Sequence, residues 1–283
     1  MSELPEVAQA GSGLDTAEER YLDLMKRVLT RTGFVSYQLP IPRGWRRLIY
    51  KPIRDLLNHW GGLQLVRQVD AEHRHIGGDW PADAETMVGM VRLNNLQECV
   101  TDVITRKVPG DLIETGVWRG GASIFMAAVL KAYGETDRTL WVADSFRGLP
   151  EPEEGTHAGD VADPLVKFHD LAVPLDVVQN NFRKYGLLSE QVRFLVGWFQ
   201  DTLPSAEVDQ LAVLRLDGDM YDSTMVALES LYPKLSVGGY VIVDDYSALA
   251  ACKDAVDEFR AREGIDDPMI TVDWAAVYWQ RTA

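Results

Sequence analysis

Four aspartates stand directly behind two apolar segments, an arrangement that brings acid to the end of a buried strand. Asp217 and Asp219 follow the run Leu211–Leu216, and Asp244 and Asp245 follow a second run, YVIV. Because parallel strands deliver their carboxyl ends to one edge of a sheet, we expect these carboxylates to converge. Side chains alternate along a strand, so Asp217 and Asp219 are expected to face the same side.

Such a group of carboxylates is chemically informative because like charges at short range repel one another unless a cation lies between them. Oxygen ligands with room for water suit Mg²⁺. We therefore predict a magnesium site formed by Asp217, Asp244 and Asp245. The alternative is a set of solvated loop acids that cap helices, and Asp222, beside Ser223, fits that description.

A glycine turn in the segment DLIETGVWRGGASIFMA lies between an expected strand, which ends near Glu114, and an expected helix. Gly116 allows the chain to reverse, and Gly120 and Gly121 are expected to let the backbone approach a ligand at the helix N-terminus. A dinucleotide fingerprint requires a second glycine where Trp118 stands. The turn therefore argues against a bound pyrophosphate and against a nicotinamide dehydrogenase.

The next expected strand, in LWVADSFRGLP, ends at Asp144. An acid at this place in a doubly wound sheet can accept hydrogen bonds from both hydroxyls of a ribose. A helix cap or a turn residue is the alternative. Together with the glycine turn, Asp144 favours a nucleoside ligand that lacks a pyrophosphate, which suggests S-adenosylmethionine.

The elements that must position these residues alternate between short apolar runs and amphipathic helices from Gly110 onward. This alternation predicts a parallel sheet with helices on both faces. The last two strand-like runs, in PMITVDWAAVYWQRTA, are joined by a short turn and must be antiparallel, so one strand near the C-terminus is reversed. The expected strands before them are 112–114, 139–143, 192–196, 211–216 and 240–243, and the expected helices are 122–133, 175–185, 223–232 and 250–262.

The N-terminal part is less regular. Residues 1–14 are small and polar and are predicted to be disordered. Residues 15–33 and 92–107 have the apolar spacing of amphipathic helices. The basic segment PRGWRRLIYKPIR predicts an amphipathic helix docked on the body; a flap over a bound ligand and a membrane-surface helix are the alternatives. We divide the chain into a disordered start (1–14), a helical extension or lid (15–109) and a catalytic domain (110–283).

Composition narrows the class of protein. The formal net charge of -15 disfavours nucleic acid as a partner. No stretch approaches the roughly 18 apolar residues that span a bilayer, and the N-terminus does not resemble a secretion signal. Cys99 and Cys252 form neither a metal-binding spacing nor a disulfide framework, so we expect reduced thiols in a cytoplasmic protein.

Several motifs in order resemble one family. The segments GDLIETGVWRGGASI, VADSFRGLP, NNFRKYGL, VRFLVGWFQDTLP, LRLDGDMYDST and GGYVIVDDY are similar to those of the macrocin O-methyltransferases. These enzymes methylate sugar hydroxyls of macrolide and aminocoumarin antibiotics with S-adenosylmethionine and Mg²⁺. The resemblance runs from about Gly78 to the C-terminus and is weak before it. It implies a Rossmann-like class I methyltransferase fold with a mostly parallel, seven-stranded sheet and an N-terminal helical extension.

The resemblance also implies roles for individual residues. Asp217, Asp244 and Asp245 match the metal ligands, and Asp219 matches the general base. The matched cofactor-binding positions are Thr86, Met87, Glu114, Thr115, Gly116, Val117, Trp118, Arg119, Asp144, Ser145, Phe146, Arg147, Gly148, Gly197 and Trp198. We therefore expect methyl transfer from S-adenosylmethionine to a sugar hydroxyl of a glycosylated natural product, by a homodimer. A metal-dependent catechol or phenol methyltransferase, or a non-catalytic cofactor-binding protein, is the alternative.

Overall fold

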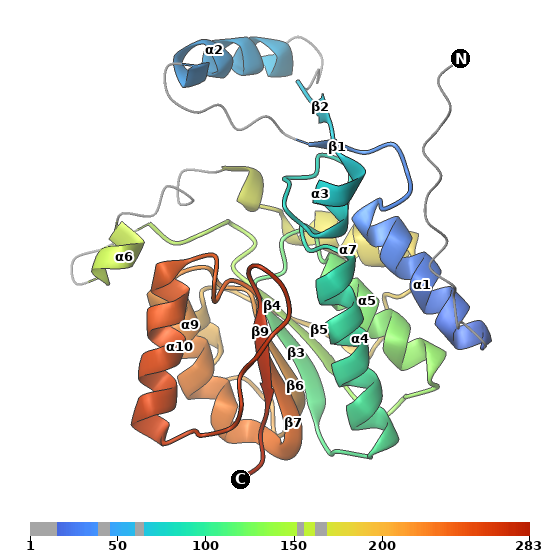
Figure 1. The fold of residues 1–283 in the computed structure, drawn as a ribbon, viewed down its shortest axis with the longest axis vertical. Helices are drawn as coiled ribbons and strands as arrows, with labels where there is room; N and C mark the ends of the chain where they lie inside the picture. The colour runs from blue at the N-terminus through green and yellow to red at the C-terminus, as the bar shows by residue number, and fades with distance from the viewer. Residues whose placement is uncertain (1–15, 39–45, 60–64, 152–155, 162–168) are drawn as a thin grey trace.

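The computed structural model describes residues 16–38, 46–59, 65–151, 156–161 and 169–283, and its centre is a seven-stranded sheet (Figure 1). The strand order is β5-β4-β3-β6-β7-β9-β8. Strands β3 to β7 run parallel to one another, whereas β9 runs antiparallel to both β7 and β8. The predicted parallel sheet with one reversed strand is therefore confirmed. The strands are β3 (Asp111–Thr115), β4 (Leu140–Asp144), β5 (Val192–Val196), β6 (Leu211–Leu216), β7 (Leu235–Val243), β8 (Ile270–Thr271) and β9 (Val277–Gln280).

Helices cover both faces of this sheet because its central strands are apolar on both sides. Every residue of β6 is buried. One core cluster joins the sheet to α1, α4, α5 and α7, and a second joins the opposite face to α9 and α10 (Figure 1). The helices are α1 (Ala17–Thr30), α4 (Met90–Thr105), α5 (Gly121–Ala132), α7 (Leu175–Lys184), α8 (Phe199–Thr202), α9 (Tyr221–Leu231) and α10 (Ala250–Glu263).

Helix α5 shows how the N-terminal helices join the core. Its residues from Gly121 to Leu130 are all buried, because α1 and α4 pack on the face that the sheet leaves free. The N-terminus of α1 is fixed by a capping box in which the Thr16 hydroxyl accepts from the Glu19 amide at 3.1 Å and the Glu19 carboxylate accepts from the Thr16 amide at 3.0 Å. Helices α1 and α4 are thus parts of the same packed body as the sheet.

The remaining N-terminal elements stand above the carboxyl ends of the strands in Figure 1. They are the strand pair β1 (Tyr37–Gln38) and β2 (Arg67–Gln68) and the helices α2 (Arg46–His59) and α3 (Ala71–His75). The predicted helix in the basic segment exists, but three of its apolar side chains are not packed against the body as predicted. Ile49, Ile53 and Leu56 share one face of α2 at helical spacing, and each is exposed. The predicted disordered start, residues 1–14, lies outside the described residues.

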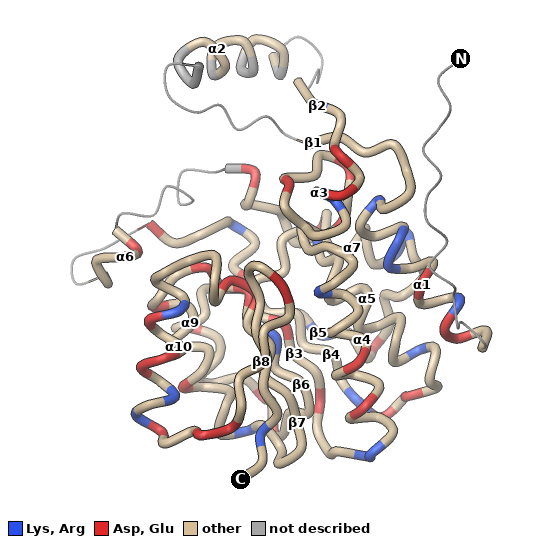
Figure 2. The backbone as a smooth tube through the Cα atoms, in the orientation of Figure 1, with Lys and Arg blue, Asp and Glu red and all other residues tan. Residues whose placement is uncertain are grey.

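Two further observations concern the whole described chain. Cys99 and Cys252 are buried free thiols. Among the described residues, no helix combines the length and the apolar character that crossing a bilayer requires. Acidic residues gather at the upper edge of the sheet in Figure 2, where the parallel strands end.

Candidate active site

A cavity of about 560 Å³ opens at the carboxyl edge of the sheet, between β3, β4, β6, β7 and the N-terminal segments. It brings together most of the residues that the sequence predicted. These are Thr86, Met87, Glu114, Gly116, Val117, Trp118, Asp144, Gly148, Asp217, Asp219, Asp244 and Asp245. A smaller adjoining pocket adds Ser145 and Trp198. Since β3, β6 and β7 are neighbours, the predicted convergence of the strand ends is confirmed.

The glycine turn packs tightly against the end of β6. Gly116 has a φ of 83°, and a Cβ atom there would lie 1.7 Å from the carbonyl oxygen of Asp217. Glycine is therefore required where the two strand ends approach each other. Gly120 and Gly121 play a different part from the one expected. Cβ atoms at these positions would meet the Val178 side chain, the Glu85 carbonyl and the Thr86 side chain, so protein rather than ligand occupies the space beside them.

Asp144 closes the turn from the neighbouring strand. Its carboxylate accepts hydrogen bonds from the backbone amides of Val117, at 2.8 Å, and Phe146, at 2.7 Å. Burial raises the pKa of this carboxyl, and the amide donors act against that rise. The Ser145 hydroxyl lies 3.5 Å from the same carboxylate as a third, longer donor. Because a carboxylate has about four lone-pair positions, some capacity for a ligand hydroxyl is left. Asp144 lines both pockets, which suits a hydrogen-bond acceptor for a ligand diol.

Five predicted cofactor residues line neither pocket: Thr115, Arg119, Phe146, Arg147 and Gly197. Arg119 has a visible supporting function. Its guanidinium donates to the carbonyls of Ala82 and Ala84 at 3.0 and 2.9 Å, and it stacks on Trp118 at 4.1 Å. This residue therefore ties the segment before Thr86 to the glycine turn. The sequence motif could not separate such a support from a residue that lines the cavity.

The segment Thr86–Val88 is held from behind by a buried arginine that the sequence reasoning missed. Arg74 is 1% exposed and donates to the carbonyls of Met87, at 2.5 Å, and Val88, at 3.0 Å. Its own charge is balanced by Asp79, 3.0 Å away and equally buried. The ion pair fixes one wall of the cavity.

Asp217, Asp244 and Asp245 each present a carboxylate oxygen within 4.8 Å of the others. Burial and the neighbouring acids raise the pKa of Asp245 well above its ordinary value. One of its oxygens, Oδ2, is buried and has no hydrogen-bond partner among the described residues. A buried carboxylate oxygen without a donor is costly unless a cation or a proton satisfies it. This donor set fits a small divalent cation.

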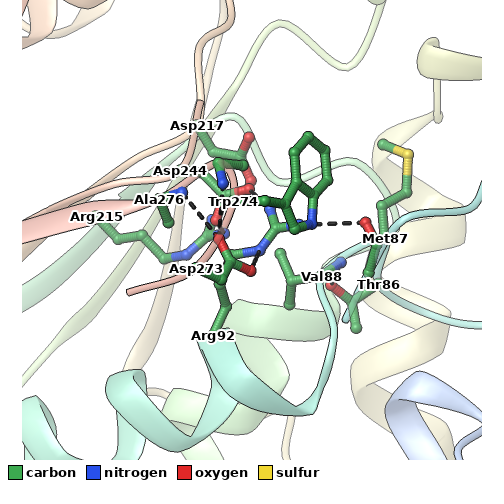
Figure 3. Close-up of polar contacts among 12 residues, drawn as sticks. Thr86, Met87, Val88, Arg92, Arg215, Asp217, Asp244, Asp273, Trp274 and Ala276 are labelled. Atoms are coloured by element: carbon green, nitrogen blue, oxygen red, sulfur yellow. Dashed lines mark hydrogen bonds and ion pairs between the residues drawn. The ribbon is translucent and has the colours of Figure 1, made fainter. Parts of the chain in front are cut away.

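Two buried arginines already neutralise part of this cluster, and neither was predicted. Figure 3 shows Asp244 between the guanidinium groups of Arg215 and Arg92. Arg215 donates to Asp244 at 2.5 Å and to Asp217 at 2.7 Å. Burial acts against the ionised form of Asp244, but the two arginines outweigh it and lower its pKa. The signal was in the sequence: a charged residue interrupts the apolar strand AVLRL.

Glu114 lies beneath the cluster. It is 1% exposed, and its two oxygens accept from Ser123 and Arg215. Burial raises the pKa of Glu114 to about 7, although Arg215 acts in the opposite direction. The carboxyl group therefore borders the cavity mainly as a support for Arg215, and it exchanges a proton near neutral pH.

Asp219 lines the cavity from a turn after β6 and not from the strand itself. Asp217 and Asp219 line the same cavity, as predicted, but strand alternation is not the cause, because β6 ends at Leu216. Asp219 instead has a left-handed φ of 59°, which is rare outside glycine and least costly for Asn and Asp. Trp118 and Phe146 also have positive φ values, so backbone strain is concentrated around this cavity.

Helix α9, which begins at Tyr221 directly after this turn, is capped from a distant segment. Asp160, on α6 (Ala158–Val161), is fully buried and accepts from the backbone amides of Tyr221, at 2.8 Å, and Asp222, at 3.0 Å. The ring of His157 stacks on Tyr221 with 4.0 Å between centroids. Asp222 itself is an exposed residue of the first helical turn, away from the cavity, as its alternative interpretation predicted.

Comparison with known proteins identifies the family. The sequence matches the family described as macrocin O-methyltransferase over residues 18–281. The chain belongs to this family. This macrocin O-methyltransferase homologue is therefore a methyltransferase enzyme, and the non-catalytic alternative is excluded.

Two relatives and one solved structure show how close the match is. The enzyme 8-demethyl-8-(2,3-dimethoxy-alpha-L-rhamnosyl)-tetracenomycin-C 4'-O-methyltransferase of Streptomyces olivaceus is 51% identical over 275 residues, 95% of each chain. Demethyldecarbamoylnovobiocin O-methyltransferase of Streptomyces niveus is 59% identical over 212 residues, 75% of this chain and 81% of that one. The structure of the O-methyltransferase NovP aligns with a TM-score of 0.83 at 50% identity, covering 94% of this chain and 100% of NovP. The predicted family and fold class are thus confirmed.

Proposed function

We propose that this enzyme transfers the methyl group of S-adenosylmethionine to a sugar hydroxyl of a glycosylated antibiotic intermediate, with Mg²⁺ at the acid cluster. One observation carries the proposal. The glycine turn with Asp144, which suits a nucleoside, and the cluster of Asp217, Asp244 and Asp245, which suits a cation, line the same cavity. A methyl donor and a hydroxyl acceptor must meet in such a shared space.

On the donor side, the chain supplies groups of matching chemistry. Asp144 would accept from the ribose hydroxyls, and Gly116 and Val117 would face the amino-acid part at the strand end. Trp198, which lines the adjoining pocket, would contact the adenine. The sulfonium of the bound donor supplies an electrophilic methyl group whose bond to sulfur breaks as the new bond to oxygen forms.

On the acceptor side, the acids would bind and orient a hydroxyl. Asp217, Asp244 and Asp245 would hold Mg²⁺, which would supply positive charge that favours loss of the acceptor hydroxyl's proton. Asp219, from the strained turn, would remove the hydroxyl proton at one of its carboxylate oxygens. Arg92 and Arg215 would keep Asp244 ionised and in place, since their charges lower its pKa.

The names of the relatives support a sugar as acceptor. One relative is named for a rhamnosyl tetracenomycin and another for demethyldecarbamoylnovobiocin. We propose that the segment 77–80 of the N-terminal extension forms the acceptor side of the cavity, since Gly77, Asp79 and Trp80 line it. A catechol or phenol methyltransferase would use the same donor site and the same cation. Only the identity of the acceptor therefore distinguishes it from a sugar methyltransferase.

The test is an assay of the purified enzyme with S-adenosylmethionine and Mg²⁺. We expect demethyldecarbamoylnovobiocin or the rhamnosyl tetracenomycin to gain one methyl group, detected by mass spectrometry, and a simple catechol to remain unchanged. Turnover should cease in EDTA and return with Mg²⁺. Methylation of catechol in preference to both glycosides would overturn the proposal, and full turnover in EDTA would remove the metal from it.

A further inference from the structure

The turn between β8 and β9 reaches back to the acid cluster. Asp273 organises this turn: its Oδ1 accepts from the amides of Ala275 and Ala276, each at 2.9 Å. Its other oxygen, Oδ2, accepts from Nε of Arg92 at 3.0 Å (Figure 3). Arg92 in turn donates to Asp244. One buried guanidinium therefore joins the C-terminal turn to the predicted metal ligands.

Trp274, the next residue of this turn, is held in place while most of its surface stays open. Its indole Nε1 donates to the carbonyl of Ile76 at 3.0 Å, and the Arg92 guanidinium lies 5.5 Å from its ring centroid. Yet 52% of the residue is exposed, and it lines the same cavity as Asp219 and Asp245. Folding has oriented a large aromatic side chain without burying it, which is typical of a contact surface for a ligand.

The chemistry of the cavity indicates what this surface contacts. A sugar ring has hydroxyl groups at its edge, which suit carboxylates, and a face of C–H bonds, which suits the face of an aromatic ring. Asp217, Asp219 and Asp245 offer the first partner, and Trp274 offers the second in the same cavity. The indole N–H is already bonded to Ile76, so the ring face is the part left for contact.

We propose that Trp274 is the platform on which the acceptor sugar stacks, with Arg92 and Asp273 as positioning residues that fix the platform relative to the acid cluster. The inference rests on the proposed function, because it assumes a glycoside acceptor. According to this inference, the sugar ring of the acceptor, and not its aglycone, contacts Trp274.

The experiment is steady-state kinetics with demethyldecarbamoylnovobiocin, Mg²⁺ and S-adenosylmethionine. We expect Trp274→Ala to raise KM for the glycoside about tenfold or more, with a change in kcat of about twofold at most. Trp274→Phe keeps an aromatic ring, so its KM for the glycoside should lie between those of the wild type and Trp274→Ala. Tyr133→Ala, which removes an exposed aromatic side chain from the end of α5, is the matched control and should leave KM unchanged. Calorimetric affinity for S-adenosylhomocysteine should be the same in all variants.

Two further measurements separate the possible outcomes. Asp273→Asn replaces the oxygen that accepts from Arg92. It should also raise KM for the glycoside, which tests the positioning role of Asp273. The free aminocoumarin aglycone serves as a competitive inhibitor. If Trp274→Ala weakens inhibition by the aglycone as much as it raises KM, the platform holds the aglycone and the proposal is wrong. An unchanged KM in Trp274→Ala also refutes it, whereas absence of turnover in the wild type refutes the proposed function instead.

Discussion

Replacement of Arg215 by methionine tests the electrostatic basis of the site. Arg215 is 2% exposed and donates to three carboxylates, those of Glu114, Asp217 and Asp244. Glu114 has a pKa of about 7, so it can take up a proton when the arginine is lost, and its contribution to the cost is small. The two aspartates each lose a charged hydrogen bond worth about 1.5–3 kcal/mol. We expect Arg215→Met to lower the free energy of unfolding in EDTA by about 3–5 kcal/mol, as for other broken buried ion pairs.

Mg²⁺ should reverse part of this loss. The variant cluster carries one positive charge fewer, so it should bind the cation more tightly than the wild-type cluster does. A ligand that binds only the folded state and is present at 100 times its dissociation constant stabilises the protein by about 2.7 kcal/mol. The gain in unfolding free energy on adding Mg²⁺ should therefore be larger for Arg215→Met than for the wild type at the same low concentration.

The assay is urea unfolding of both proteins, in EDTA and over a series of Mg²⁺ concentrations. Arg193→Met is the control, because it makes the same change on the parallel edge strand β5, where the side chain is exposed. It should change neither stability nor the response to Mg²⁺. If Arg215→Met were as stable as the wild type in EDTA, or gained no more from Mg²⁺ than the wild type, the cluster would not be a charge-balanced cation site.

Three further outcomes are expected. Asp219→Asn should lower kcat by about 10²–10⁴-fold at every Mg²⁺ concentration, whereas the rate of Asp217→Asn should recover in part as Mg²⁺ is raised; a reversed pattern would exchange the two roles. The pKa of Glu114 is about 7 in the folded protein, against an ordinary value of 4.5. Between these two pH values the carboxyl ionises in the unfolded chain but not in the folded protein, so the wild type loses stability as the pH rises. Glu114→Gln should therefore gain about 3 kcal/mol relative to the wild type between pH 4.5 and 7 in chemical unfolding, and a pH-independent difference would show that the carboxyl titrates normally. Asp144→Ala should weaken calorimetric binding of S-adenosylhomocysteine in EDTA by about 1.5–3 kcal/mol, provided that thermal unfolding confirms an intact fold; unchanged affinity would remove the ribose assignment.

Much of the site was predictable because it depends on where strands end. The alternation of apolar runs and helices fixes a parallel sheet, and a parallel sheet places the residues after β6 and β7 beside each other. Asp217, Asp244 and Asp245 therefore follow from the order of elements alone, and the observed cluster confirms their convergence. The glycine turn was predictable for the same reason, since Gly116 must pass close to the end of β6.

The residues that were missed depend on contacts between distant parts of the chain. Arg92 belongs to an amphipathic helix whose face cannot be matched to Asp244 from spacing alone, and Trp274 lies in a turn without any motif. The orientation of α2 also depends on tertiary packing: an apolar stripe indicates burial, yet Ile49, Ile53 and Leu56 are exposed in this chain. Local pattern predicts elements, and long-range packing decides which of their faces are used.

The cap that Asp160 provides has a consequence for engineering acceptor preference. Gly148, Leu149 and Leu171 line the cavity, so the segment between them is a natural unit to exchange among relatives. Asp160 lies inside this unit, yet its two hydrogen bonds hold the start of α9, two residues after Asp219. A chimaera that imports a foreign loop without an acid at this position would alter the new binding surface and also release the start of α9. Designers of such hybrids should therefore graft around Ala158–Val161 and keep that short helix as a fixed anchor.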